Sequence, residues 1–293
     1  MPTHKFTTVL PALAILSSIT FLGLGTSLAK HTLFPLFGAQ GTTAIRVGFS
    51  AILLLVIWRP WRYGLSGPDA IRLVCYGSAM GLVTLSFYLA LRTIPFGIAV
   101  AIEFAGPLTV ALFSSRRPLD FVWVLLAMTG LGLLLPLGDT AHFDRAGVMY
   151  ASAAAVFWAI YIVAGRQMKH FHAGYSVSSG LAVAALIVVP VGIPHLGSTL
   201  LSPWIFATAL CVAVMSSAVP FTLEMIALKR LPPQVFAIMI SMEPAVSAML
   251  GLVLLNEQLS ITQWLAIGLV VVASAGSSVQ GQHENSMHAT QEK

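Results

Sequence analysis

Long apolar stretches separated by short polar segments dominate the pattern of this chain. A helix that crosses a bilayer needs about 20 mostly apolar residues. Stretches without Asp, Glu, Lys or Arg recur at residues 6–29, 73–91, 121–138, 146–165, 173–223 and 258–283. The pattern predicts ten spanning helices, at residues 7–28, 42–59, 71–91, 95–114, 121–137, 147–165, 174–193, 203–228, 234–255 and 261–279.

The composition agrees with this pattern. Of the 293 residues, 57% are hydrophobic and 9% are charged, whereas soluble domains carry about 25% charged residues. The chain is therefore predicted to be an all-α protein that crosses a membrane many times. The net charge of +5 does not indicate nucleic acid as a partner, because the cations lie in short loops between apolar segments. The first apolar stretch is longer than that of a signal peptide and is interpreted as a span.

The loop charges predict the orientation. An even number of spans places both termini on one side of the membrane. If that side is the cytoplasm, it holds 11 of the Lys and Arg residues, the opposite side holds 3, and Arg46 lies within a span. Because cytoplasmic loops carry an excess of Lys and Arg, both termini are predicted to be cytoplasmic. Residues 280–293 form a polar cytoplasmic tail.

The chain contains an internal repeat. ALRTIP at 90–95 matches ALKRLP at 227–232, an offset of 137 residues that also relates Pro107 to Pro244. The chain is thus predicted to consist of two five-helix halves, residues 1–140 and 146–279. Because five is odd, the second half enters the membrane from the other side, which makes an inverted repeat, a feature typical of secondary transporters. The loop SSRRPLD is basic and its counterpart LLNEQLS is not, as opposite sidedness requires.

A family resemblance rests on five stretches. They are SLAKHTLFPLFGAQGTTAIR (27–46), PFGIAVAIEFAGPLTVALFSSRRPLDFVWVLLA (95–127), FWAIYI (157–162), LEMIALKRLP (223–232) and SMEPA (241–245). Through them the chain resembles the EamA-type transporters of the drug/metabolite transporter superfamily, and among these the bacterial inner-membrane threonine/homoserine exporters. The resemblance implies export of small neutral amino acids by proton antiport. It also implies a central cavity lined mainly by the first, third, fourth, sixth, eighth and ninth helices.

Away from the span ends, four charged residues fall within the predicted spans: Arg46, Glu103, Glu224 and Glu243. The aspartates and histidines fall in loops or tails, which argues against a membrane-embedded enzyme with a buried base and against a metal site. Cys75 and Cys211 lie far apart in the sequence and form no metal motif. The chain is therefore expected to need no metal or cofactor. An exporter of drugs or other metabolites from the same superfamily remains the alternative function.

Glu103 and Glu243 are the main candidates for binding a proton and a substrate ammonium group. Each lies deep within its span, and the repeat offsets them by three residues, so both are expected to face one central space. A carboxyl group buried in an apolar environment takes up a proton more readily than one in water. Glu224 lies closer to the cytoplasmic end. The alternative for each acid is a structural one, a hydrogen-bonding group that holds helices together.

The prolines add backbone groups to this hypothesis. A proline has no N–H, so Pro107, Pro220 and Pro244 each leave the carbonyl four residues earlier without its helical partner. For Pro107 this carbonyl belongs to Glu103, and for Pro220 it belongs to Ser216. Freed carbonyls of this kind are tolerated where they line a cavity or where neighbours satisfy them.

The other candidates are weaker. Lys30 and Arg46 are possible contacts for a substrate carboxylate; the alternative is that Lys30 simply ends a helix, and that Arg46 is interfacial or forms a structural ion pair. Tyr88, Phe104, Trp158 and Tyr161 fall on helices expected to line the cavity, although packing or lipid contact explains them equally well. Gly77, Gly81, Gly97 and Gly106 are expected to let helices approach closely.

Overall fold

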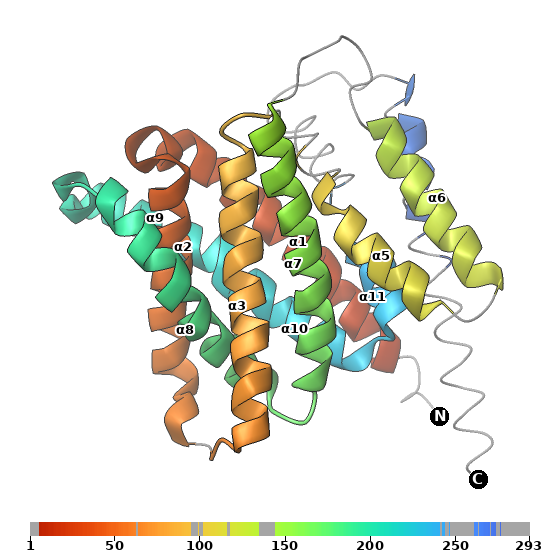
Figure 1. Cartoon of the computed structure of the whole chain (residues 1–293), viewed down its shortest axis with the longest axis horizontal. Helices are drawn as coiled ribbons and strands as arrows, with labels where there is room; N and C mark the ends of the chain where they lie inside the picture. The colour runs from red at the N-terminus through yellow and green to blue at the C-terminus, as the bar shows by residue number, and fades with distance from the viewer. Residues whose placement is uncertain are drawn as a thin grey trace.

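The structure is a computed structural model that describes residues 6–62, 64–94, 99, 102–115, 118–134, 144–240, 242–243, 246, 261–262, 264–269, 271–273 and 276. In this part of the chain every regular element is helical, as predicted (Figure 1). The long helices are α1 (Phe6–Thr32), α2 (Phe34–Trp58), α3 (Gly67–Ala90), α7 (Arg145–Gln167) and α8 (Ala173–Gly192). The shorter ones are α5 (Ala105–Ser114), α6 (Pro118–Leu134), α9 (Pro203–Ala213), α10 (Val219–Arg230) and α11 (Pro233–Ile240). Between them lie the 3-10 turns η1 (Pro60–Arg62), η2 (Ile193–His195) and η3 (Ser198–Leu201), and the π-helical segment η4 (Val214–Ala218).

Six helical stretches of the described residues are long and apolar enough to cross a membrane. They are Leu10–Thr32, Phe34–Arg62, Gly67–Ala90, Arg145–Gln167, Ala173–His195 and Pro203–Arg230. Each coincides with one of the ten predicted spans. The helices α5, α6 and α11 and the helical residues 264–269 fall on the other four. The all-helical architecture is thus confirmed for the described residues, and the number ten stays a prediction.

The helices pack mainly between the first and the second half of the chain (Figure 1). α2 packs along α8, α3 lies against both α7 and α8, and α1 lies along α10. α5 packs against α7 and α11. The ring of Trp58 at the end of α2 lies 4.8 Å from that of His172 just before α8, so these two helices are antiparallel. The long helices therefore form one interlocked bundle.

The two ends of this bundle carry different numbers of cations. One end contains the link from α2 to α3, the turn from α7 to α8 and the end of α10. It holds Arg59, Arg62, Arg72, Arg166, Lys169, Lys229 and Arg230. The other end contains the link from α1 to α2, the end of α3 and the start of α7, and it holds Lys30, Arg92 and Arg145. The described cations therefore divide unevenly between the ends, as the loop pattern predicted.

Two predicted helix boundaries need correction. α2 begins at Phe34 rather than at residue 42, because Pro35 lies in its first turn, where the missing N–H has no helical partner to lose. A kink follows at Gly38, whose φ of 62° a residue without Cβ adopts at little cost. The predicted helix 203–228 is likewise not uniform, because the π-helical η4 separates α9 from α10.

Three residues expected in loops lie in helices instead. They are in the terminal turns of α1, α3 and α6, and they are His31, Asp69 and Asp120.

Glycines allow the close helix contacts that the sequence predicted. A Cβ on Gly77 of α3 would lie 2.6 Å from the carbonyl oxygen of Gly180 in α8. A Cβ on Gly106 of α5 would collide with the carbonyl of Ala155 in α7. Gly97 lies outside the described residues. Backbone contact at these points draws the two halves of the chain together.

We expect Gly77→Ala to lower the free energy of unfolding by about 1–3 kcal/mol, because α3 and α8 must move apart to admit the methyl group. Gly132→Ala in α6 is the matched control, since nothing lies within 4 Å of its Cβ position. There alanine should be neutral or stabilising, because it favours a helix over glycine. Thermal unfolding of both purified variants in detergent tests this, and equal melting temperatures would contradict it.

Candidate functional site

Arg46 is the centre of a buried polar cluster between α2, α3 and the π-helical η4. Its side chain is only 4% exposed. Nε donates a hydrogen bond to Ser217 Oγ at 2.9 Å, Nη1 donates to the Tyr88 hydroxyl at 2.8 Å, and Nη2 donates to the Ser216 carbonyl oxygen. The guanidinium carbon also lies 5.2 Å from the centre of the Tyr88 ring, in cation–π range. Arg46 is thus inside the bundle, which corrects the expectation of an interfacial position.

The sequence of η4 explains why an acceptor is available to Arg46. In a π-helix the backbone bonds run from residue i to residue i+5, and the Val219 N–H bonds the Val214 carbonyl in this way. Pro220 has no N–H to offer the Ser216 carbonyl, and Arg46 takes that place. One turn further along α2, the Ser50 hydroxyl donates to the Ala213 carbonyl at 2.8 Å. Side chains of α2 therefore satisfy the irregular backbone of η4.

Glu224 of α10 is held by hydroxyl groups from two other helices. Tyr161 of α7 donates to Oε2 at 3.1 Å, and Ser18 of α1 lies 3.1 Å from Oε1 and 3.2 Å from the Pro220 carbonyl oxygen. The Glu224 side chain is 5% exposed. The Tyr161 ring stacks on Tyr76 at 5.2 Å. Glu224 therefore connects α1, α7 and α10, and this geometry agrees with the structural alternative for this acid.

Glu103 differs from Glu224 in its partners. It lies just before α5 and is 8% exposed. In the described part of the chain its carboxylate accepts no hydrogen bond, and no Lys or Arg nitrogen lies within 4.0 Å of it. Glu103 does lie within electrostatic range of Glu243 and Arg46. It is thus a buried acid that no hydrogen-bond donor among the described residues engages.

The structure brings all three glutamates into electrostatic range of Arg46. Glu243, which is partly buried, interacts with Glu224 and with Arg46, and Glu224 also interacts with Arg46. The cluster therefore brings one cation and three acidic groups together in a low-dielectric interior, where electrostatic interactions are strong. An arrangement of this kind is complementary to a small molecule that carries both an anionic and a cationic group.

The predicted aromatic residues surround this cluster. Phe104, next to Glu103, packs edge-to-face on Trp158 of α7 with 4.7 Å between ring centres. Tyr88 and Tyr161 use their hydroxyl groups on Arg46 and Glu224. All four side chains are buried. Two of them therefore bind ionisable groups of the cluster, and the other two, Phe104 and Trp158, pack on each other.

The remaining predicted residues are two prolines and Lys30, and they lie in different parts of the chain. Pro107 is the third residue of α5 rather than an interior residue of a long helix, so its missing N–H falls in the first turn. Lys30 lies on the exposed last turn of α1, and Arg46, not Lys30, is the cation of the buried cluster. Pro244 lies outside the described residues.

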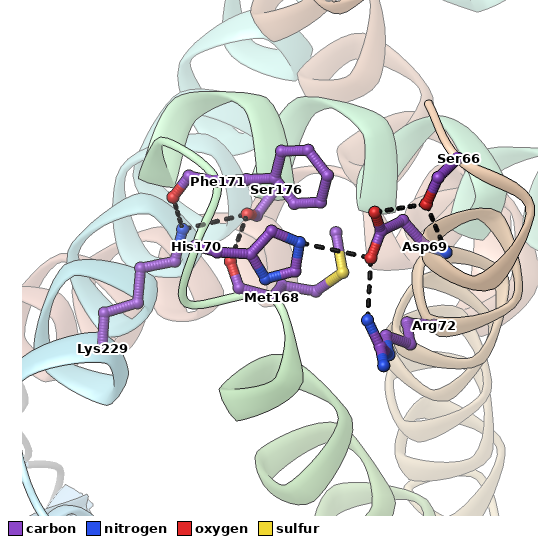
Figure 2. Close-up of polar contacts among 8 residues, drawn as sticks. All are labelled: Ser66, Asp69, Arg72, Met168, His170, Phe171, Ser176 and Lys229. Carbon is purple, nitrogen blue, oxygen red and sulfur yellow. Dashed lines mark hydrogen bonds and ion pairs between the residues drawn. The ribbon is translucent and has the colours of Figure 1, made fainter. Parts of the chain in front are cut away.

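A second polar cluster joins helices at the cation-rich end of the bundle (Figure 2). Asp69 in the first turn of α3 interacts with Arg72 at 2.9 Å and with His170 Nε2 at 3.2 Å. Lys229 at the end of α10 donates to the Phe171 carbonyl oxygen at 2.6 Å and to Ser176 Oγ at 3.0 Å. The turn between α7 and α8 is therefore tied to α3 on one side and to α10 on the other.

Sequence reasoning missed the hydroxyl groups that serve the ionisable residues. Ser18, Ser216 and Ser217 looked like small residues of apolar spans. One signal was available on α2, where Thr42, Arg46 and Ser50 follow each other at intervals of four and so share a helix face. The partners on η4 gave no such signal, because the extra residue of a π turn changes which side chains face inward.

The comparisons with known proteins identify the chain as a membrane transporter. The EamA-like transporter family matches residues 145–279. The chain is 44% identical, over 96% of both sequences, to a protein named threonine/homoserine exporter RhtA in Escherichia coli K12, and equally to its counterpart in Salmonella typhimurium LT2. This chain belongs to the EamA-like transporter family. It is a multi-pass membrane protein and not an enzyme.

Two more distant similarities agree with this assignment. An uncharacterized transporter of Bacillus subtilis, YwfM, is 26% identical over 85% of this chain and 88% of its own length. One crystal structure, described only as that of a protein, superposes with a TM-score of 0.74 at 20% identity and covers 95% of this chain and 98% of its own. At that identity the likeness concerns the fold alone.

We expect Tyr161→Phe to lower the free energy of unfolding by about 1–3 kcal/mol, because a buried carboxyl group loses one of its hydrogen-bond partners. Tyr150→Phe is the control, since Tyr150 lies on the same helix but is 42% exposed. Thermal unfolding in detergent compares the two. If both tyrosines tolerate the change equally, the Tyr161–Glu224 hydrogen bond does not stabilise the bundle.

Proposed function

We propose that this chain exports small neutral amino acids such as threonine and homoserine across the bacterial inner membrane, by proton antiport with alternating access. The names of the RhtA relatives support the substrate class, since the identity extends over nearly the whole chain. The observation that carries the proposal is the buried cluster of Arg46, Glu103, Glu224 and Glu243, because a zwitterion requires a cationic and an acidic partner in one site.

The three acids have different roles in this proposal. Glu103 is the main site for the proton and for the substrate ammonium group, because nothing else in the described residues occupies its carboxylate. Glu243 is its counterpart from the second half of the chain. Glu224, already bonded to Tyr161 and Ser18, holds the helices around the site. An acid that alternates between a proton and an ammonium group exchanges one for the other, which is the chemistry of antiport.

An inverted repeat would supply the two access states. Exchanging residues 1–140 with 146–279 relates α1 to α7, α2 to α8 and α3 to the α9–α10 segment. The packing of α3 on α7 then corresponds to that of α1 on α10, and α2 on α8 corresponds to itself. This internal correspondence supports two five-helix halves that rock about a shared site. Residues 280–293 follow as a polar tail.

The transport assay is counterflow of labelled threonine in proteoliposomes, with and without a pH gradient. We expect the wild-type chain to concentrate threonine when a gradient is imposed. Glu103→Gln should lower the gradient-driven rate about tenfold or more, because the amide cannot carry a proton and loses a charge-assisted contact. Asp144→Asn, which alters the exposed cap of α7, is the control for an acid outside the cluster.

Two results would count against this proposal. Gradient-driven efflux that Glu103→Gln leaves unchanged would remove Glu103 from the proton pathway. A wild-type chain that ignores threonine and homoserine but moves another solute from a panel would favour the alternative, an exporter of drugs or other metabolites.

We also propose that the cation-rich end faces the cytoplasm, together with both termini. In a chain with Cys75 and Cys211 replaced by serine, a single cysteine at Lys169 should resist a membrane-impermeant maleimide in intact spheroplasts. A single cysteine at Thr199, in the 3-10 turn η3 that follows α8, should react. Labelling at position 169 but not at position 199 would indicate the opposite orientation and contradict this proposal.

A further inference from the structure

Arg46 has hydrogen-bonding capacity that the described residues do not use. A guanidinium carries five N–H groups, and three of them have acceptors: Ser217 Oγ, the Tyr88 hydroxyl and the Ser216 carbonyl. One N–H on Nη1 and one on Nη2 have no acceptor among the described residues. In the described part of the chain no carboxylate oxygen lies within 4.0 Å of the guanidinium, so neutral oxygens alone receive these bonds. A pair of terminal N–H groups matches the two oxygens of a carboxylate.

Thr42 provides a second, independent indication of a ligand here. Its hydroxyl is completely buried and has no hydrogen-bond partner in the described residues. Thr43, its neighbour, donates to the carbonyl of Ala39 at 2.7 Å, as helical threonines commonly do. The equivalent acceptor for Thr42 is the carbonyl of Gly38, which the kink turns out of the helical direction with a ψ of −170°. The kink thus leaves this hydroxyl open.

Thr42 and Arg46 lie one turn apart on the same face of α2. An unpartnered buried hydroxyl and an incompletely used buried cation each cost stability when nothing binds them. A single carboxylate would satisfy both groups. The acids of the cluster lie within electrostatic range of Arg46, and in the described residues none of them forms an ion pair with it.

We propose that Arg46 and Thr42 form the receptor for the α-carboxylate of the exported amino acid, and that Tyr88 and η4 position the Arg46 guanidinium. The inference rests on the proposed function and adds the group that recognises the acid end of the substrate. It orients the substrate, with the carboxylate toward α2 and the ammonium group toward Glu103. A neutral carboxamide in place of the carboxylate should therefore bind poorly.

The test is competition against labelled threonine in the counterflow assay, with unlabelled threonine and with threoninamide. For the wild-type chain we expect the amide to compete at least about tenfold less well, the factor for one charge-assisted hydrogen bond. In Arg46→Gln the half-inhibitory concentrations of the two compounds should converge. If Arg46 only holds η4 in place, transport falls but the wild-type ratio of the two persists, and the assignment is wrong.

Two further variants keep the inference testable if Arg46→Gln does not fold. Thr42→Val removes a buried hydroxyl without a partner, so the melting temperature should stay or rise while the KM for threonine rises about fivefold. An unchanged KM would contradict the role of Thr42. Ser50→Ala is the matched control, because it removes a hydrogen bond from α2 to the Ala213 carbonyl at the end of α9 and leaves Arg46, Thr42 and Tyr88 in place. It should keep the wild-type preference for threonine over the amide, and loss of that preference would contradict the assignment.

Failure of the inference can be told apart from failure of the proposed function. A wild-type chain that does not exchange threonine contradicts the function. A chain that exchanges threonine but accepts the amide equally well contradicts only the carboxylate receptor.

Discussion

The high cost of an unsatisfied charge in an apolar bundle governs the centre of this structure. Arg46 is buried within the bundle, so two helical segments, α3 and η4, supply oxygen atoms to it. One of these atoms is a backbone carbonyl that a regular α-helix would have used internally. The irregular η4, the proline that follows it and the polar face of α2 therefore belong together. Each element would be unfavourable alone, and each is explained by the others.

The same cost of burying an unsatisfied charge distinguishes Glu224 from Glu103, because the two acids have different partners. Glu224 has hydroxyl donors from α1 and α7, and so it contributes to the framework whether or not a ligand is present. Glu103 precedes Phe104, whose ring packs on Trp158, and lacks such donors in the described residues. A bundle that satisfied every buried acid in the same way would be stable but closed to substrate. Among the described residues, this bundle leaves the Glu103 carboxyl group without a hydrogen-bond donor and the Arg46 guanidinium incompletely bonded, within electrostatic range of each other.

Much of this site could be predicted from the sequence, because ionisable residues are rare in apolar spans and Arg46, Glu103, Glu224 and Glu243 stand out there. The repeat could also be recognised, since it depends on matched residues at a fixed offset. The partners of Arg46 could not be predicted. They depend on the rotation of α9 and α10 about their axes, and a π turn leaves no mark in hydropathy. The kink at Gly38 was equally hidden, so α2 was predicted to start too late and Arg46 was placed too near the interface.

The π-helical segment has a mechanical consequence for the second half of the chain. A π turn holds one more residue than an α turn, and one residue corresponds to about 100° of rotation. If η4 tightened into α-helix, α10 would turn by roughly that angle relative to α9. Glu224 would then leave Ser18 and Tyr161, and the Ser216 carbonyl would leave Arg46. The extra residue of η4 therefore sets the rotation of α10 at which α1, α2 and α7 contact the polar groups of the segment from Pro203 to Arg230.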